Sequence, residues 1–171
     1  IFFCSMGGFD THTNQINGQG NLFSQFSQAA RAFYDELGTA SQNIQDRVVL
    51  FTLSDFGRTM NPAAAGTADV GSDHAWGNHM MVLGGPVLGG NFYGMNTVVN
   101  QSPLPQYVLG SLDDADSGTG ARGRWIPTTS VDQYAATIAK WFGLPQDSTT
   151  LSTVFPNLAN FTTTDLGFMV P

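Results

Sequence analysis

The stretch RVVLFTL, residues 47–53, decides the fold class. It is a continuous apolar run rich in β-branched residues, which is typical of a central strand in a parallel sheet. The run IFFCS at residues 1–5 predicts a second buried strand. Between the two runs, apolar residues recur at helical spacing from Asn21 to about Ile44, with a break or an end expected near Gly38. Strand, helix and strand together predict a right-handed βαβ unit.

Three further features follow toward the C-terminus. Residues 80–83 predict a third short strand, and residues from about 96 to 124 are expected to be rich in loops. Ser130 and Gln133 form a capping-box pattern, which predicts a helix over residues 131–142. The sequence therefore predicts an α/β fold, in the form of a parallel-sheet sandwich flanked by helices.

Composition and length limit the classes of function. A chain of 171 residues can bury a sizeable core, and we interpret residues 1–171 as a single domain. The net charge of -7 argues against nucleic-acid and anionic-membrane partners, because both need basic clusters. No apolar run approaches the roughly 20 residues of a membrane helix. Charged residues make up only 11%, and small polar residues replace them, which favours an exported protein.

The first residues of the chain carry two expectations. Cys4 is the only cysteine, so no intrachain disulfide is possible, and its apolar surroundings predict a buried structural thiol. The chain opens at Ile1 directly inside a strand-like run, without an initiator Met or a signal peptide. We therefore expect it to be the C-terminal portion of a longer domain.

Three short polar segments hold the residues that carry chemistry. All three histidines and several aspartates lie in GGFDTH (7–12), LSDFGRT (53–59) and SDHAWGNH (72–79). Asp10 and His12 follow the first predicted strand and Asp55 follows the second, and ligands of open α/β sheets bind beyond the carboxyl ends of strands. We expect these three residues to converge with His74 or His79 at one edge of the sheet. Imidazole and carboxylate ligands together suit zinc, iron or manganese better than calcium.

A structural interpretation of the same residues stays open. A histidine near a turn often makes only hydrogen bonds, and an aspartate after a strand is often a helix cap. In that interpretation Asp55 caps a turn and pairs with Arg58. In the functional interpretation, Arg58 clamps an anionic substrate through two hydrogen bonds.

The three segments resemble the bacterial DUF1501 family, a domain of unknown function. The resemblance rests on GGFDTH, LSDFGRT and SDHAWGNHMMVLGGPV in this order, and it extends to SVDQYAATIAKWFGL near the C-terminus. That family is placed in the alkaline phosphatase and sulfatase superfamily, so the resemblance implies an alkaline-phosphatase-like fold. Many members carry twin-arginine export signals, which implies a periplasmic or extracellular location.

The superfamily's chemistry implies two metal ions that bridge a phosphate or sulfate ester. By this resemblance one ion is held by Asp10, His12 and either His79 or His74. Asp55 would match a ligand of the other ion. Phe56 stands where a histidine is expected next, so the second site is depleted. A further Asp and the nucleophile would lie upstream of residue 1.

The leading hypothesis is therefore a metal-dependent hydrolase of phosphate or sulfate esters that is incomplete without upstream residues. Its cofactor would be one or two divalent ions, zinc or manganese, and its partners a small anionic ester and the N-terminal part of the same polypeptide. Two alternatives remain: a non-catalytic secreted binding or structural module, and a mononuclear metal protein with a His-carboxylate facial set. We expect His79 to be a better third ligand than His74, because a strand fixes its backbone. We also expect no turnover of generic aryl esters by residues 1–171 alone.

Overall fold

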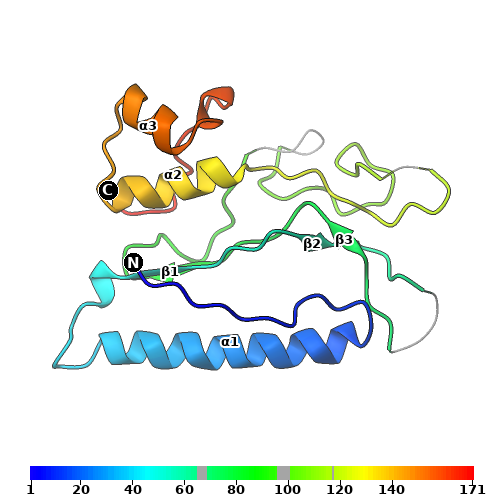
Figure 1. The fold of residues 1–171 in the computed structure, drawn as a ribbon, viewed down its shortest axis with the longest axis horizontal. Coiled ribbons are helices and arrows are strands. Elements are labelled where there is room, and N and C mark those ends of the chain that lie inside the picture. The colour runs from blue at the N-terminus through cyan, green and yellow to red at the C-terminus, as the bar shows by residue number, and fades with distance from the viewer. Residues whose placement is uncertain (65–68, 96–100, 117) are drawn as a thin grey trace.

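The structure, a computed structural model, describes residues 1–64, 69–95, 101–116 and 118–171 (Figure 1). It is a mixed α/β fold with small antiparallel sheets. The helices are α1 (Gln15–Leu37), α2 (Val131–Trp141) and α3 (Ser148–Val154), with short 3-10 helices at Gln45–Arg47 and Leu158–Asn160. The strands are β1 (Val49–Phe51), β2 (Gly57–Arg58), β3 (His74–Ala75) and β4 (Val82–Gly84). In the described residues, no helix is long and apolar enough to cross a membrane.

The strand pairs run antiparallel, so the predicted parallel order of neighbouring strands was wrong. β1 pairs with β4, with Leu50 opposite Leu83, and β2 pairs with β3. Residues 47–53 do contain the predicted strand, β1, but its pairing partner is residues 82–84. The chain between these two strands holds no crossover helix in the part that the structure describes. It reverses direction, and an antiparallel pair results.

The N-terminal run does not form the predicted buried strand. Residues 1–5 have no strand assignment, and Ile1, Phe2 and Phe3 are exposed. Cys4 is exposed as well, so the expected buried thiol was also wrong. An apolar run becomes a strand only when a neighbouring strand satisfies its backbone hydrogen bonds, and no strand or bridge among the described residues pairs with residues 1–5.

Helix α1 ends where predicted but begins earlier. Gly38 is its C-cap, and its N–H donates to the carbonyl oxygen of Asp35, while the N–H of Thr39 donates to that of Glu36. The first two turns contain Gly18 and Gly20, which have low helix propensity, so the sequence pattern predicts a later start than the structure shows. Contacts from the preceding segment compensate, because the Phe9 ring packs edge-on against Phe23 at 5.5 Å.

Helix α2 matches its prediction closely. Both hydrogen bonds of the capping box between Ser130 and Gln133 are present, and the helix begins at Val131. Its inner face packs Tyr134 and Ile138 against Phe168 from the C-terminal tail. Of the predicted loop-rich stretch, residues 96–100 and 117 lie outside the described part. The rest contains one isolated bridge, between Asp114 and Trp125.

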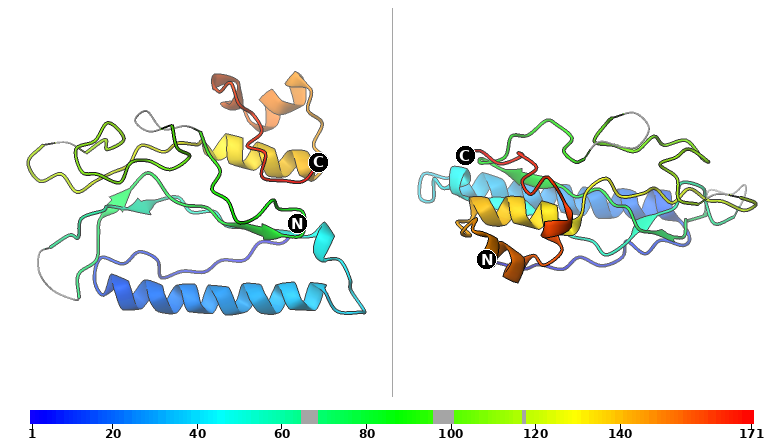
Figure 2. Two further views of the ribbon diagram at one scale, coloured as in Figure 1. Left: turned by 180° about the vertical axis from the view of Figure 1, so that it is seen from behind. Right: turned by 90° about the horizontal axis from the view of Figure 1, so that it is seen from above.

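The helices lie on opposite sides of the strands. Figure 1 shows α1 along one side of β1, with α2 and α3 on the other, and the views in Figure 2 agree. The β2–β3 pair lies beyond the end of β1, toward the start of α1 (Figure 1). This is the end of the molecule where the polar segments of the sequence gather.

Candidate metal centre

Three segments distant in sequence lie side by side at this end of the fold. The backbone N–H of Gly71 donates to the carbonyl oxygen of His12 (3.1 Å), which lays residues 70–72 along residues 11–13. Arg58 in β2 pairs with His74 in β3. The approach is close, because a Cβ atom on Gly71 would lie 1.9 Å from the carbonyl oxygen of Thr11. Glycine at this position therefore allows the His12 segment to sit beside the His74 segment.

Asp10, His12 and His74 converge at this junction. The Nε2 atom of His12 lies 3.0 Å from Oδ1 of Asp10, and Nε2 of His74 lies 2.8 Å from the same oxygen. One ligand atom from each residue can be chosen so that all three lie within 4.8 Å of one another. All three side chains are exposed, so an ion from solution can reach them.

Aromatic stacking orients His74. Its imidazole stacks on the Phe56 ring at 4.2 Å with an interplanar angle of 9°. The His12 imidazole lies near His74 at 5.1 Å and 22°. Phe56, which stands where the resemblance led us to expect a histidine, therefore positions a histidine from another segment. Asn78 reinforces this arrangement, because its Nδ2 donates to the carbonyl oxygen of Phe56 (2.7 Å).

Arg58 makes contacts that differ from both sequence interpretations. Its Nη1 donates to Oδ1 of Asp10 (3.0 Å), its Nε donates to the hydroxyl of Ser72 (3.1 Å), and its Nη2 donates to the Ser72 carbonyl. Only 13% of its side chain is exposed. Arg58 therefore pairs with Asp10 in place of Asp55, and all three of its nitrogens already bind protein oxygens.

The pKa of the Asp10 carboxyl is lowered from its ordinary value of 3.8. The largest cause is the hydrogen bond from His74, followed by the hydrogen bond from Arg58. Both groups favour the ionised carboxylate. Asp10 is therefore held in the form that binds a cation.

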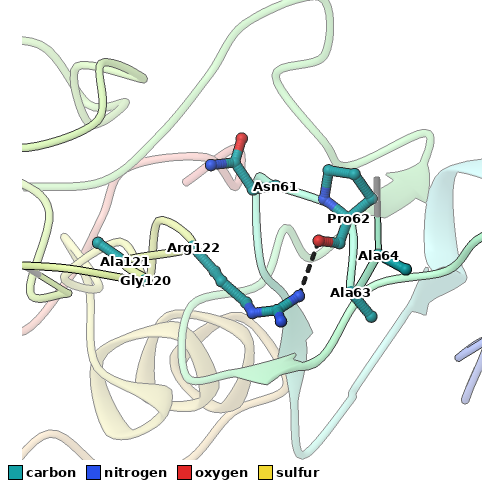
Figure 3. Close-up of a pocket in the computed structure, with 7 residues that line it drawn as sticks. All are labelled: Asn61, Pro62, Ala63, Ala64, Gly120, Ala121 and Arg122. Atoms are coloured by element: carbon teal, nitrogen blue, oxygen red, sulfur yellow. Dashed lines mark hydrogen bonds between the residues drawn. The ribbon is translucent and has the colours of Figure 1, made fainter. Parts of the chain in front are cut away.

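A second aspartate approaches from behind His12. Oδ1 of Asp73 lies 3.9 Å from Nδ1 of His12, the ring nitrogen that faces away from Asp10. Its other oxygen lies 3.3 Å from Nε of Arg122. Arg122 lines a pocket of about 340 Å³, where its Nη1 donates to the carbonyl oxygen of Pro62 (2.7 Å, Figure 3). At 3.9 Å the pair is too far apart for a hydrogen bond, so Asp73 is a nearby carboxylate of His12 that the candidate residues from the sequence did not include.

Two candidate residues do not join this cluster. His79 donates to or accepts from the Tyr107 hydroxyl at 2.7 Å, and it is absent from the group that can share an ion in the described residues. Asp55 is also outside that group. We expected His79 to be a better third ligand than His74, but it is His74 that lies beside Asp10 and His12. β3 carries His74 to Asp10, whereas His79 lies beyond the end of β3.

The three residues fit a divalent transition-metal ion. With ligand bonds of about 2.1 Å, neighbouring ligands at right angles are about 3.0 Å apart. The two nitrogen-to-oxygen separations, 2.8 and 3.0 Å, are close to that edge length. Two imidazoles and one carboxylate form the facial set that binds iron and related ions with open positions. The donor set therefore suits one ion with room for a further ligand.

Comparisons with known proteins identify one family. Residues 1–106 match the family described as "Protein of unknown function (DUF1501)". These residues include Asp10, His12, Arg58 and His74. No curated protein and no solved structure matches the chain.

Proposed function

The chain belongs to the family "Protein of unknown function (DUF1501)", and we propose that its Asp10, His12 and His74 bind a divalent zinc or manganese ion. The observation that carries the proposal is the convergence of three ligand atoms within 4.8 Å, from segments that are distant in sequence. Chance surface clusters of acidic groups are common. Here, however, stacking on Phe56 and the ion pair with Arg58 hold two of the three residues in place.

We further propose that this site serves the hydrolysis of phosphate or sulfate esters. The resemblance to the alkaline phosphatase and sulfatase superfamily supports the substrate class, and an alkaline-phosphatase-like fold for the whole domain is part of the same proposal. A bound divalent ion would polarise an ester oxygen and stabilise the charge that develops on it. The nucleophile would come from outside residues 1–171, in a periplasmic or extracellular protein.

Within this proposal the protein side chains have separate roles. Asp10 contributes the negative charge that offsets the cation, and His12 and His74 contribute neutral nitrogens. Arg58 is a positioning residue, because it directs the Asp10 carboxylate while its own nitrogens are engaged. Direct contact with substrate by Arg58, the anion-clamp hypothesis, would require these hydrogen bonds to be exchanged.

The test is metal-dependent anion binding by the 171-residue chain. Calorimetric titration with zinc should give binding that His12→Ala weakens by at least about tenfold, the lower end for disturbed metal shells. Inorganic phosphate or sulfate should then bind the zinc-loaded chain but not the chelator-treated chain. Anion binding of equal affinity with and without zinc would contradict the proposal.

A mononuclear metal protein with different chemistry is the second candidate. It is favoured by the absence of Asp55 from the cluster, since one group of three ligands supplies one ion among the described residues. Metal stoichiometry separates the candidates. Two zinc ions per chain would support the two-metal hydrolase, and one ion that binds no phosphate or sulfate would support the second candidate.

A further inference from the structure

A large cavity lies on the α2 side of the strands, apart from the three metal-binding candidates. Its volume is about 950 Å³, within the range of about 300 to 1,000 Å³ for small-molecule sites. Residues before and within α2, residues around β4, and the loops at 87–95 and 103–107 line it. Figure 1 shows these loops and α2 on the opposite side of β1 from α1.

The lining of this cavity is aromatic and uncharged. Among the described residues, no Asp, Glu, Lys or Arg lines it. Its aromatic wall includes the rings of Trp76, Phe92, Tyr107, Trp125, Tyr134 and Phe168, with Tyr93 and Phe161 beside them. Trp76 and Phe92 are 61% and 70% exposed, so their faces are available to a ligand. A charged group buried there would lose its hydration without an opposite charge to compensate, whereas an aromatic ring can stack on these faces.

One polar pair stands within the aromatic wall. His79 and Tyr107 are joined by the 2.7 Å hydrogen bond between Nε2 and the hydroxyl, and the Tyr107 ring packs edge-on against Trp125 at 5.5 Å. By contrast, the Tyr134 hydroxyl already donates to the backbone carbonyls of Thr52 and Met81 (3.2 and 3.4 Å). Burial raises the pKa of the Tyr107 hydroxyl, which keeps it protonated and able to donate. The pair can therefore bind one hydroxyl or ether oxygen of a ligand.

The cavity wall is continuous with the candidate metal centre. Trp76 follows β3, the strand that carries His74. Arg124, which precedes Trp125, donates from Nε to the His74 carbonyl at 3.4 Å. A Cβ atom on Gly77 would lie 3.1 Å from the carbonyl oxygen of Trp125. The same two segments thus form the wall of the cavity and support one metal-binding candidate.

We infer that this cavity binds an uncharged aromatic group, with one oxygen on the His79–Tyr107 pair, and that it holds the alcohol part of the ester substrate. The inference rests on the proposed function, because the charged end of the ester would lie at Asp10, His12 and His74. The inference narrows the substrate class to phosphate or sulfate esters of aromatic alcohols, as opposed to esters of small hydrophilic alcohols. It also gives His79 a role in ligand binding instead of metal binding.

The test uses 2-naphthol as an uncharged aromatic probe, titrated by calorimetry into the metal-free chain. Wild type should bind it, Trp76→Ala should weaken binding at least about threefold through lost stacking, and Tyr107→Phe should weaken it about fivefold through a lost hydrogen bond. Trp141→Ala removes an indole of the same size that does not line the cavity, and should change the affinity less than twofold. Circular dichroism of each variant confirms that it is folded.

Two results would overturn the inference. One is the absence of naphthol binding by the wild-type chain, and the other is an equal loss in Trp76→Ala and Trp141→Ala. Zinc affinity is measured in parallel on the same preparations. Loss of naphthol binding with zinc binding intact would remove this inference alone. Naphthol binding without zinc binding would remove the proposed metal function, and with it the assignment of the cavity to an ester, but would leave the cavity as an aromatic-binding site.

Discussion

The Nε2 atom of His74 lies 2.8 Å from Oδ1 of Asp10, although the two residues are 64 positions apart in the chain. The same oxygen is also contacted by Nε2 of His12 and by Nη1 of Arg58, each at 3.0 Å. Contacts between such distant segments order the chain at a cost in conformational entropy. We interpret this contact as the centre of the site.

The ionisation of Asp10 provides the first prediction. Because His74 and Arg58 both stabilise the carboxylate, its NMR titration midpoint should lie below 3.8. A lowered pKa in the folded state stabilises the fold at pH values above the unfolded pKa, and this stabilisation is lost as pH falls through the folded value. Arg58→Gln should move the midpoint upward.

Arg31→Gln, which removes an exposed arginine paired with Asp35, is the matched control and should leave the Asp10 midpoint unchanged. A midpoint at or above 3.8 in the wild-type chain would refute the ion pair.

Close backbone packing between β2 and the segment after β3 provides the second prediction. A Cβ atom on Gly57 would lie 1.6 Å from the carbonyl oxygen of Gly77, so Gly57→Ala must push these segments apart. It should lower the free energy of unfolding by about 1 to 3 kcal/mol and weaken zinc binding, because β3 carries His74. Thermal unfolding measures the change in stability, and calorimetric titration with zinc measures the change in affinity.

Gly20→Ala is the control for this substitution. A Cβ atom there meets nothing within 4 Å, and the residue lies within α1. It should stabilise the fold by about 0.5 to 1 kcal/mol through higher helix propensity, with zinc affinity unchanged. Equal destabilisation by both substitutions would show that the loss of stability does not come from the close contact between Gly57 and Gly77.

The third prediction concerns turnover. The Ser72 hydroxyl, the serine beside the cluster, accepts from Arg58 and donates to Oε1 of Gln15 at 2.7 Å. Neither partner is a general base that would activate a nucleophile. The zinc-loaded 171-residue chain should therefore hydrolyse p-nitrophenyl phosphate and p-nitrophenyl sulfate no faster than zinc in buffer. Zinc-dependent turnover that Ser72→Ala abolishes would show that a nucleophile lies within the chain.

Features that depend on local sequence were predictable. Helix α2 was confirmed with both bonds of its capping box, because Ser130 and Gln133 are three residues apart and need only each other. The end of α1 at Gly38 is local in the same sense. Asp10 and His12 share one short loop, so little chain entropy opposes their meeting.

Features that depend on the choice of a distant partner were not predictable. The run at 47–53 indicates a strand, but nothing in it distinguishes residues 82–84 from residues 1–5 as a neighbour. His74 and His79 lie in the same polar segment, and the choice between them depends on the pairing of Arg58 with His74. One signal was available: the aromatic Phe56 after Asp55, which stacks on His74 in the structure.

The most direct test of the central claim is a calorimetric zinc titration of His74→Ala beside His79→Ala. These variants remove the same side chain from one segment, but only His74 contacts Asp10. His74→Ala should weaken zinc binding at least about tenfold, whereas His79→Ala should change it less than twofold. A tenfold loss of zinc affinity in His79→Ala with unchanged affinity in His74→Ala would show that His79, and not His74, belongs to the metal site.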